Sequence, residues 1–162
     1  MWAVKRSDFF FYVLSLMLCA VSYFVLHGNI ELALLPHKVA LEYLFNYNFN
    51  FIENVGYEQV GGLFIVGRNC LGVKLFINLF LLLVLGFLSK CKEVRHKILA
   101  LIKFYFLAAL VALSVTIIRI AASIPFCSWE RFQLIHNLIS LGAYFMAGLV
   151  LYYIVERRVN AI

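Results

Sequence analysis

The chain has 162 residues, of which 65% are hydrophobic and 14% are charged. Soluble domains are roughly 45–50% apolar and about 25% charged, so this composition excludes a soluble globular protein and predicts an integral membrane protein. Its length leaves room for one small membrane domain over residues 1–162. The formal net charge of +6 is spread between apolar segments, which is typical of a topology signal and argues against a nucleic-acid partner.

Four apolar segments are long enough to cross a lipid bilayer as helices, which takes about 20 residues. In chain order they cover roughly residues 9–26, 71–88, 98–124 and 132–155. The third segment exceeds the thickness of a bilayer, so we expect it to tilt or to let Lys103 extend toward the interface. The sequence therefore predicts an all-α bundle of about four transmembrane helices.

The longest connection, residues 27–70, follows the first segment. Pro36 is tolerated in the first turn of a helix, and three polar residues recur every four positions after it: Lys38, Glu42 and Asn46. We therefore expect an amphipathic helix that begins near Pro36 and lies on the membrane surface. The glycine-punctuated run 56–67 is expected to re-enter the edge of the bilayer or to form a lip over a site, and His37 is expected at the interface.

The distribution of Lys and Arg predicts the orientation of the bundle. Three cationic residues, Lys38, Arg68 and Arg131, lie in the connections 27–70 and 121–131. The two termini and the connection 90–97 together hold eight: Lys5, Arg6, Lys90, Lys92, Arg95, Lys97, Arg157 and Arg158. Because cytoplasmic loops carry the excess of positive charge, we expect a multi-pass protein of the inner (cytoplasmic) cell membrane with both termini in the cytoplasm. The connections 27–70 and 121–131 are then expected at the outer face.

Cys70 begins the second apolar segment at its predicted outer end. Unsatisfied N–H groups at a helix amino terminus stabilise an anion, and the thiolate is the nucleophilic form of cysteine. Arg68 precedes Cys70 by two residues and Lys74 follows it by one helical turn, so both are candidates for electrostatic support and substrate binding. The alternative is that Cys70 is a small apolar residue at the start of a helix.

Arg119 and His136 are polar residues inside the third and fourth segments, near the same predicted face. An Arg at mid-bilayer costs about 2.5–3.5 kcal/mol on insertion scales, so we expect Arg119 either to snorkel outward or to face the bundle interior and pair with an anion. His136 has the side chain most often used as a general acid and base. Its alternative is a neutral, hydrogen-bonded histidine of the core.

Cys127 is also predicted at the outer face, beside Pro125. In an oxidising compartment it could form a disulfide with Cys70, which would make Cys70 structural. No pair of Cys and His residues has the spacing of zinc ligands, and no His-Glu-x-x-His or glycine-rich phosphate motif is present. We therefore expect neither a metal nor a cofactor.

Three blocks of the sequence resemble the signature blocks of the exosortase/archaeosortase family: Cys70-Leu71-Gly72-Val73-Lys74, Thr116-Ile117-Ile118-Arg119-Ile120, and His136 followed by Gly142. The resemblance covers roughly residues 60–150, and the short chain looks like the form called exosortase K. Leu71 departs from the small hydroxyl residue often found after the cysteine. Thr116 departs from the Asn often found three residues before the arginine, and many members have additional spans.

The resemblance implies a membrane cysteine protease or transpeptidase in which Cys70, Arg119 and His136 are the catalytic residues. Its clients would be membrane-anchored proteins whose carboxyl-terminal signal combines a short motif, a transmembrane helix and a basic tail. The competing interpretation is a non-catalytic scaffold or transporter subunit, in which Arg119 and His136 have structural roles. A third is a thiol oxidoreductase that uses Cys70 and Cys127.

Overall fold

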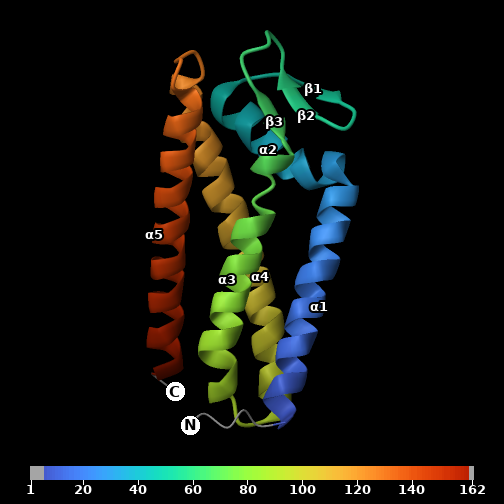
Figure 1. Ribbon diagram of the computed structural model, residues 1–162, viewed down its shortest axis with the longest axis vertical. Coiled ribbons are helices and arrows are strands. Elements are labelled where there is room, and N and C mark those ends of the chain that lie inside the picture. The colour runs from blue at the N-terminus through green and yellow to red at the C-terminus, as the bar shows by residue number, and fades with distance from the viewer. Residues whose placement is uncertain (1–5, 161–162) are drawn as a thin grey trace.

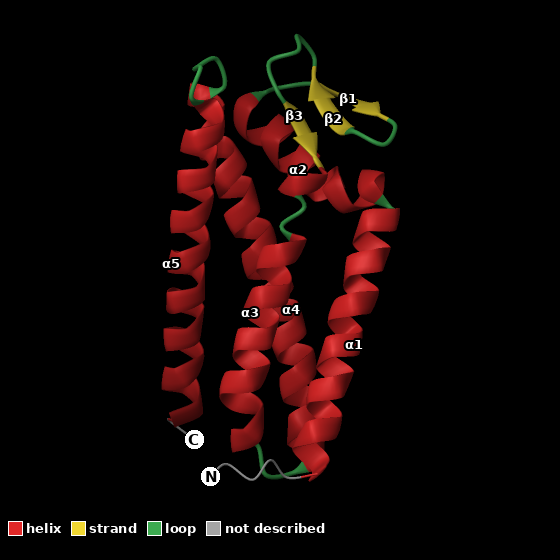
Figure 2. Ribbon diagram, in the orientation of Figure 1, coloured by secondary structure: helices red, strands yellow, loops and turns green. Residues whose placement is uncertain are grey.

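The computed structural model describes residues 6–160. Figures 1 and 2 show a long helical bundle capped at one end by a short helix and a small sheet. Within the described range, four helical segments are long and apolar enough to cross a membrane. The predicted all-α membrane bundle is therefore confirmed. Its α-helices are α1 (Arg6–Gly28), α2 (Ile30–Phe45), α3 (Val73–Phe87), α4 (Val94–Ser123) and α5 (Phe132–Asn160).

α3 is the central helix of the bundle. It lies between α1 and α5 in Figure 1 and packs against α1, α4 and α5. In its most apolar stretch 61% of the residues are buried, compared with 17–22% in the other three spans. The outer faces of α1, α4 and α5 expose large apolar side chains, such as Phe24, Phe106 and Phe145. Such continuous apolar faces are typical of contact with lipid.

A buried ion pair joins α1 to α4 near the end of the bundle that carries the termini. The Lys97 ammonium group contacts Asp8 Oδ1, and both side chains are almost fully buried. The sequence pattern places Lys97 in the connection 90–97, whereas in the structure it is a buried residue of the bundle. Among the other residues of that count, Lys5 and the side chains of Arg6 and Arg158 lie outside the described part of the structure.

α2 crosses the end of the bundle opposite the termini (Figure 2) and packs against α4 and the sheet. Its buried residues recur at helical spacing: Ile30, Leu34, His37 and Leu41. This face begins before Pro36, so the prediction that Pro36 opens the helix is wrong. Burial of the apolar face outweighs the hydrogen bond that proline cannot donate. The expected polar face is present, because Lys38 and Glu42 pair at 3.6 Å.

Residues 49–67 contain three short strands that the sequence pattern did not indicate. β1 (Phe49–Ile52), β2 (Gly56–Gln59) and β3 (Ile65–Gly67) form an antiparallel sheet in that order. Gly56 has φ +136°, and a Cβ at this position would lie 2.3 Å from the carbonyl oxygen of Val66. Glycine is therefore required for β2 and β3 to approach each other. The glycine-rich run, expected to re-enter the bilayer or to form a lip over a site, forms β2 and β3.

Candidate active site

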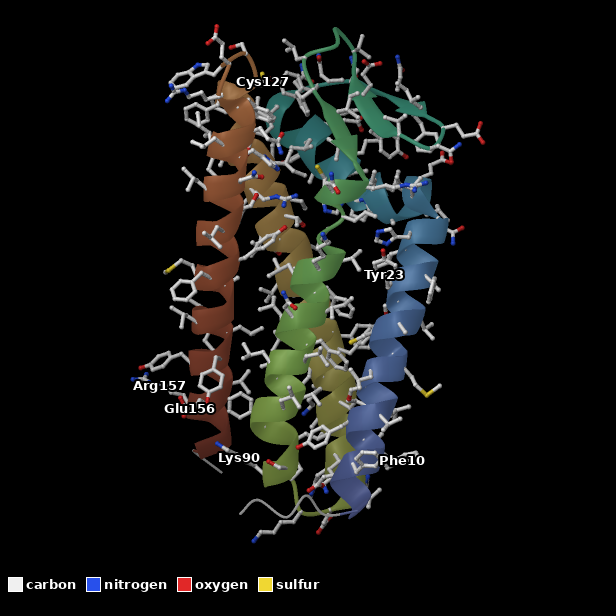
Figure 3. The ribbon with its side chains drawn as sticks, viewed as in Figure 1. Phe10, Tyr23, Lys90, Cys127, Glu156 and Arg157 are labelled. Atoms are coloured by element: carbon white, nitrogen blue, oxygen red, sulfur yellow. The ribbon has the colours of Figure 1, made fainter. Side chains whose placement is uncertain are left out.

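The three candidate catalytic residues come from three helix ends on one side of the molecule. Cys70 precedes α3, Arg119 lies near the end of α4, and His136 lies one turn into α5. These ends lie beside α2 and the sheet, away from both termini (Figure 1). In Figure 3, Cys127 from the connection between α4 and α5 marks the same end of the bundle, whereas Lys90 and Arg157 mark the other.

Cys70 lies in a short 3₁₀ turn, Arg68–Cys70, and not in the first turn of α3. The left-handed residue Gly72 separates this turn from the helix, which begins at Val73. Cys70 is therefore not at the amino terminus of α3, where backbone N–H groups were expected to stabilise its thiolate. Other groups lie beside the thiol. The thiol lies within hydrogen-bonding reach of the Gly67 backbone and of the Arg119 side chain.

Arg119 is 4% exposed, so it does not snorkel to solvent. Its Nη1 donates to the Tyr144 hydroxyl at 2.5 Å, and its Nη2 donates to the carbonyl oxygen of Asn69 at 3.1 Å. Its Nε has no hydrogen-bond partner among the described residues. None of the ion pairs within that part of the chain involves Arg119. A buried cation with a carbonyl, a hydroxyl and a thiol around it is suited to stabilise an anion.

His136 is oriented by a hydroxyl group of α4. Its Nδ1 lies 3.0 Å from Ser123 Oγ, which itself donates to the carbonyl oxygen of Arg119 at 2.8 Å. Because serine has a single hydroxyl proton, Ser123 must accept the Nδ1–H of the neutral imidazole. The Nε2 of His136 is then unprotonated and can act as a base.

A pocket of about 210 Å³ brings the thiol and the imidazole together. Cys70, Ser123, Cys127 and His136 are its polar or sulfur-containing lining residues, and the remaining lining is apolar: Leu63, Phe64, Ile65, Ile120, Ile124 and Phe132. The pocket is therefore an apolar cavity with a nucleophile and a base in its wall. Such a site can bind an apolar side chain beside a reacting carbonyl group.

Arg68 and Lys74 do not occupy the positions expected for helpers of the thiol. Both side chains are exposed, and Lys74 belongs to α3, whereas Cys70 precedes that helix. The cation beside the thiol is Arg119. If Arg68 or Lys74 contacts a substrate, it does so from the surface around the site.

A second buried contact, between α2 and α4, lies next to the site. Nε2 of His37 on α2 lies 3.1 Å from Thr116 Oγ1 on α4, and Thr116 also fills the space where a Cβ of Gly72 would lie. His37, expected at the membrane interface, is 2% exposed and lies between α2 and α4. Burial, and then the charge of Arg119, lower the pKa of His37 from 6.5 to about 4.

Sequence reasoning did not identify Ser123, Tyr144 or Gly67 as parts of the site. Ser123 follows Arg119 by four residues and Tyr144 follows His136 by eight, so helical spacing places each on a face shared with a candidate residue. The contact with Gly67 depends on the unpredicted β3 strand and carried no such signal. All four cysteines are free, Cys70 and Cys127 included.

Among the described residues, no group of three or more His, Cys, Asp or Glu side chains is placed to hold a metal ion. The functional groups that the candidate site brings together are a thiol, an imidazole and a guanidinium group. Comparisons with protein-family models, with curated proteins and with solved structures found no match to this chain.

Proposed function

We propose that the protein is a membrane-embedded cysteine protease or transpeptidase of the exosortase type. The observation that carries this proposal is the shared pocket of Cys70 and His136 beside a buried Arg119. Among the described residues, the Nε–H of Arg119 has no hydrogen-bond partner, and no carboxylate forms an ion pair with Arg119. A negative charge formed at the thiol or on a bound carbonyl oxygen is the charge that Arg119 is placed to neutralise.

The first half of the reaction forms a thioester. Nε2 of His136 takes the thiol proton of Cys70, and the thiolate attacks the scissile carbonyl carbon. A carbon–sulfur bond forms, and the negative charge moves to the carbonyl oxygen, where Arg119 stabilises it. The carbon–nitrogen bond then breaks as His136 returns its proton to the leaving amine. The amino-terminal part of the client remains attached to Cys70.

The second half releases the client. An amine or a water molecule attacks the thioester carbonyl while His136 accepts its proton. The carbon–sulfur bond breaks, Cys70 leaves as a thiolate, and the proton held by His136 restores the thiol. An amine acceptor gives transpeptidation and water gives hydrolysis, and no step requires a metal or a cofactor.

The position of the site suggests the kind of client. Cys70 lies at one end of the bundle rather than in its middle, so a substrate anchored by its own transmembrane helix would present the residues just outside that helix. A client that carries a motif, a transmembrane helix and a basic tail has this geometry. With the termini in the cytoplasm, as the positive-inside pattern favours, cleavage would take place at the outer face of the cell membrane.

The test is cleavage of a reporter in cells that express the chain. The reporter joins a soluble outer domain to the carboxyl-terminal segment of a neighbouring gene product that ends in a motif, an apolar helix and basic residues. We expect no cleavage with Cys70→Ala or Cys70→Ser. Cys127→Ala, which removes the other thiol of the same pocket, should leave cleavage intact.

Normal cleavage of the reporter in both Cys70 variants would overturn the proposal. The bonds from Arg119 to Tyr144 and Asn69 would then be best explained as structural contacts of a non-catalytic membrane protein. Thermal unfolding of each purified variant in detergent shows whether a loss of cleavage reflects a loss of folding.

A further inference from the structure

β3 is an edge strand whose free side faces the candidate active site. The order β1-β2-β3 leaves one side of β3 without a strand partner among the described residues. In Figure 1, β3 is the strand of the sheet nearest to α5. Ile65 of β3 lines the pocket together with Cys70 and His136, as do Leu63 and Phe64, which precede the strand.

The register of the sheet determines which backbone groups point to this free side. The N–H of Gln59 donates to the carbonyl oxygen of Phe64 at 3.1 Å, and the pairing continues through Val66 and Gly67. Hydrogen-bonded pairs alternate with non-hydrogen-bonded pairs along antiparallel strands. Val66 therefore bonds toward β2, whereas the N–H and C=O groups of Ile65 and Gly67 point away from it.

The other pair of strands supports this assignment independently. The N–H of Val60 donates to the carbonyl oxygen of Asn48 at 2.8 Å. Val60 and Glu58 thus direct their backbone groups to β1. The alternate residues of β2, Tyr57 and Gln59, direct theirs to β3. Both edges of β2 are consequently occupied, and the open backbone groups lie on the outer sides of β1 and β3. Of these two edges, β3 is the one whose residues line the pocket.

The carboxyl-terminal end of β3 lies close to the thiol of Cys70. The Gly67 backbone lies within hydrogen-bonding reach of Cys70, which follows it by three residues. Arg119 reaches the same thiol and keeps one buried Nε–H without a described partner. A peptide carbonyl placed at the end of this strand edge would meet a nucleophile and an unused hydrogen-bond donor.

We propose that a client binds by adding its cleavage motif as an extended strand to the free edge of β3. Its backbone pairs with Ile65, and one apolar side chain enters the pocket beside Cys70. Strand addition draws affinity from main-chain hydrogen bonds and specificity from pockets for alternate side chains. This inference rests on the proposed function and specifies its substrate as an extended apolar peptide, so the motif cannot be helical when it is cleaved.

The experiment compares two thiol reagents on the full chain in detergent. In an acetylated apolar tripeptide chloromethyl ketone, the thiolate sulfur displaces chloride and forms a carbon–sulfur bond. Iodoacetamide alkylates thiols in the same way with loss of iodide, but it offers no peptide backbone. Labelling of each cysteine is followed over time by mass spectrometry of proteolytic fragments.

Ile65→Pro removes the N–H that points to the free edge and leaves the bonds between β2 and β3, because that N–H is not part of them. We expect labelling of Cys70 by the peptide reagent to slow by about tenfold, the effect of losing one or two hydrogen bonds. Labelling by iodoacetamide should not change. The conservative variant Ile65→Val keeps the N–H and a β-branched side chain, so the peptide reagent should label it faster than Ile65→Pro.

A second comparison leaves the protein unchanged. Methylation of alternate backbone nitrogens of the tripeptide reagent removes the complementary hydrogen bonds, in which the reagent N–H donates to the carbonyl oxygen of Ile65, and should slow labelling of the wild type to a similar extent. Equal labelling rates with the methylated and unmethylated reagents would overturn strand addition. Absence of Cys70 labelling by either reagent, with Cys127 or Cys91 labelled instead, would overturn the proposed function itself.

Discussion

At the scale of single residues, the candidate site depends on a hydroxyl group that fixes the state of the base. Ser123 donates to the carbonyl oxygen of Arg119 and accepts from Nδ1 of His136. The imidazole is thereby held with Nε2 unprotonated and directed by a contact on α4. The same serine connects the His136 ring to the backbone of Arg119.

The first prediction concerns Ser123→Ala. Without the acceptor at Nδ1, neutral His136 loses its preference for the tautomer that can take the thiol proton. We expect kcat for reporter cleavage to fall about 10- to 100-fold, part of the 10²–10⁴-fold that general acid–base catalysis supplies. The loss in kcat should exceed any change in KM, since Ser123 contributes one hydroxyl group to a pocket whose lining is otherwise largely apolar.

Ser140→Ala is the matched control, because Ser140 Oγ donates to the carbonyl oxygen of His136 within the helix and does not contact the ring. Its kcat should remain close to that of the wild type. Equal kcat values for Ser123→Ala and wild type would show that the tautomer is not set by Ser123.

At the scale of elements, α2 and the start of α3 both meet α4 at Thr116. His37 bonds to the Thr116 hydroxyl from one side, and Gly72 approaches its methyl group from the other. α4 thus supplies Thr116 to hold the scaffold and Arg119, one turn later, to act on the thiol. A displacement of either neighbouring element would change the position of Cys70 relative to Arg119.

The second prediction is a pH dependence of stability that arises from His37. Its pKa is about 4 in the folded protein, mainly because it is buried, and near 6.5 when unfolded. Between these values the unfolded chain binds more protons, so the free energy of unfolding should fall as pH decreases from about 6.5 to 4. The slope should approach, but not exceed, about 1.4 kcal/mol per pH unit.

Thermal unfolding in detergent at a series of pH values measures this effect. His37→Gln should flatten the curve in that range, whereas His96→Gln, which alters an exposed histidine, should keep the wild-type slope. An unchanged slope in His37→Gln would assign the acid sensitivity to other groups.

The third prediction concerns Gly72→Ala. Gly72 has φ +69°, and a Cβ would lie 2.5 Å from Cγ2 of Thr116. The left-handed conformation alone costs a non-glycine residue about 1–2 kcal/mol, and the contact forces α3 away from α4. We expect a lower unfolding temperature and slower reporter cleavage. Gly148→Ala has open space around the new methyl group and should leave both properties unchanged or slightly raise stability.

At the scale of the whole molecule, the bundle separates two chemically different ends. One end carries the termini, the buried Asp8–Lys97 pair and the connection 88–93. The other carries α2, the sheet and the candidate site. Cys91 and Cys127 belong to opposite ends, and both are partly buried free thiols.

The fourth prediction uses these two cysteines to test the orientation. In variants that retain only one of them, a membrane-impermeant maleimide added to intact cells should label Cys127 and not Cys91. Permeabilised cells should label both. Labelling of Cys91 but not Cys127 in intact cells would place the candidate site in the cytoplasm and contradict the positive-inside prediction.

Much of the architecture could be predicted from the sequence. The four apolar runs define the spans because a bilayer imposes both length and composition on a helix. Positions counted along those runs also place Cys70, Arg119 and His136 near one end. The residues that face the lipid and those that face the core could not be separated, since both are apolar.

The remaining features depend on contacts between distant segments. The strands are three or four residues long, and their Asn and Gly residues favour turns. The burial of His37 follows from the docking of α2 on α4, 79 residues away in sequence. Cys70 was assigned to the first turn of a helix because nothing in the local pattern marked Gly72 as a left-handed residue packed against Thr116.

The short link between β3 and the thiol limits where the chain can vary in length. Only Arg68 and Asn69 separate Gly67 from Cys70, so an insertion there would rotate the thiol away from the strand edge. The turn between β1 and β2 adjoins this link, since a Cβ on Gly67 would lie 3.1 Å from the carbonyl oxygen of Val55. The turn between β2 and β3, which contains Gly61 and Gly62, lies at the opposite end of both strands, and lengthening a surface turn costs little in closure entropy. An epitope tag or fluorescent label inserted between Gly61 and Gly62 should therefore leave the position of the thiol unchanged, whereas one inserted after Gly67 should displace it.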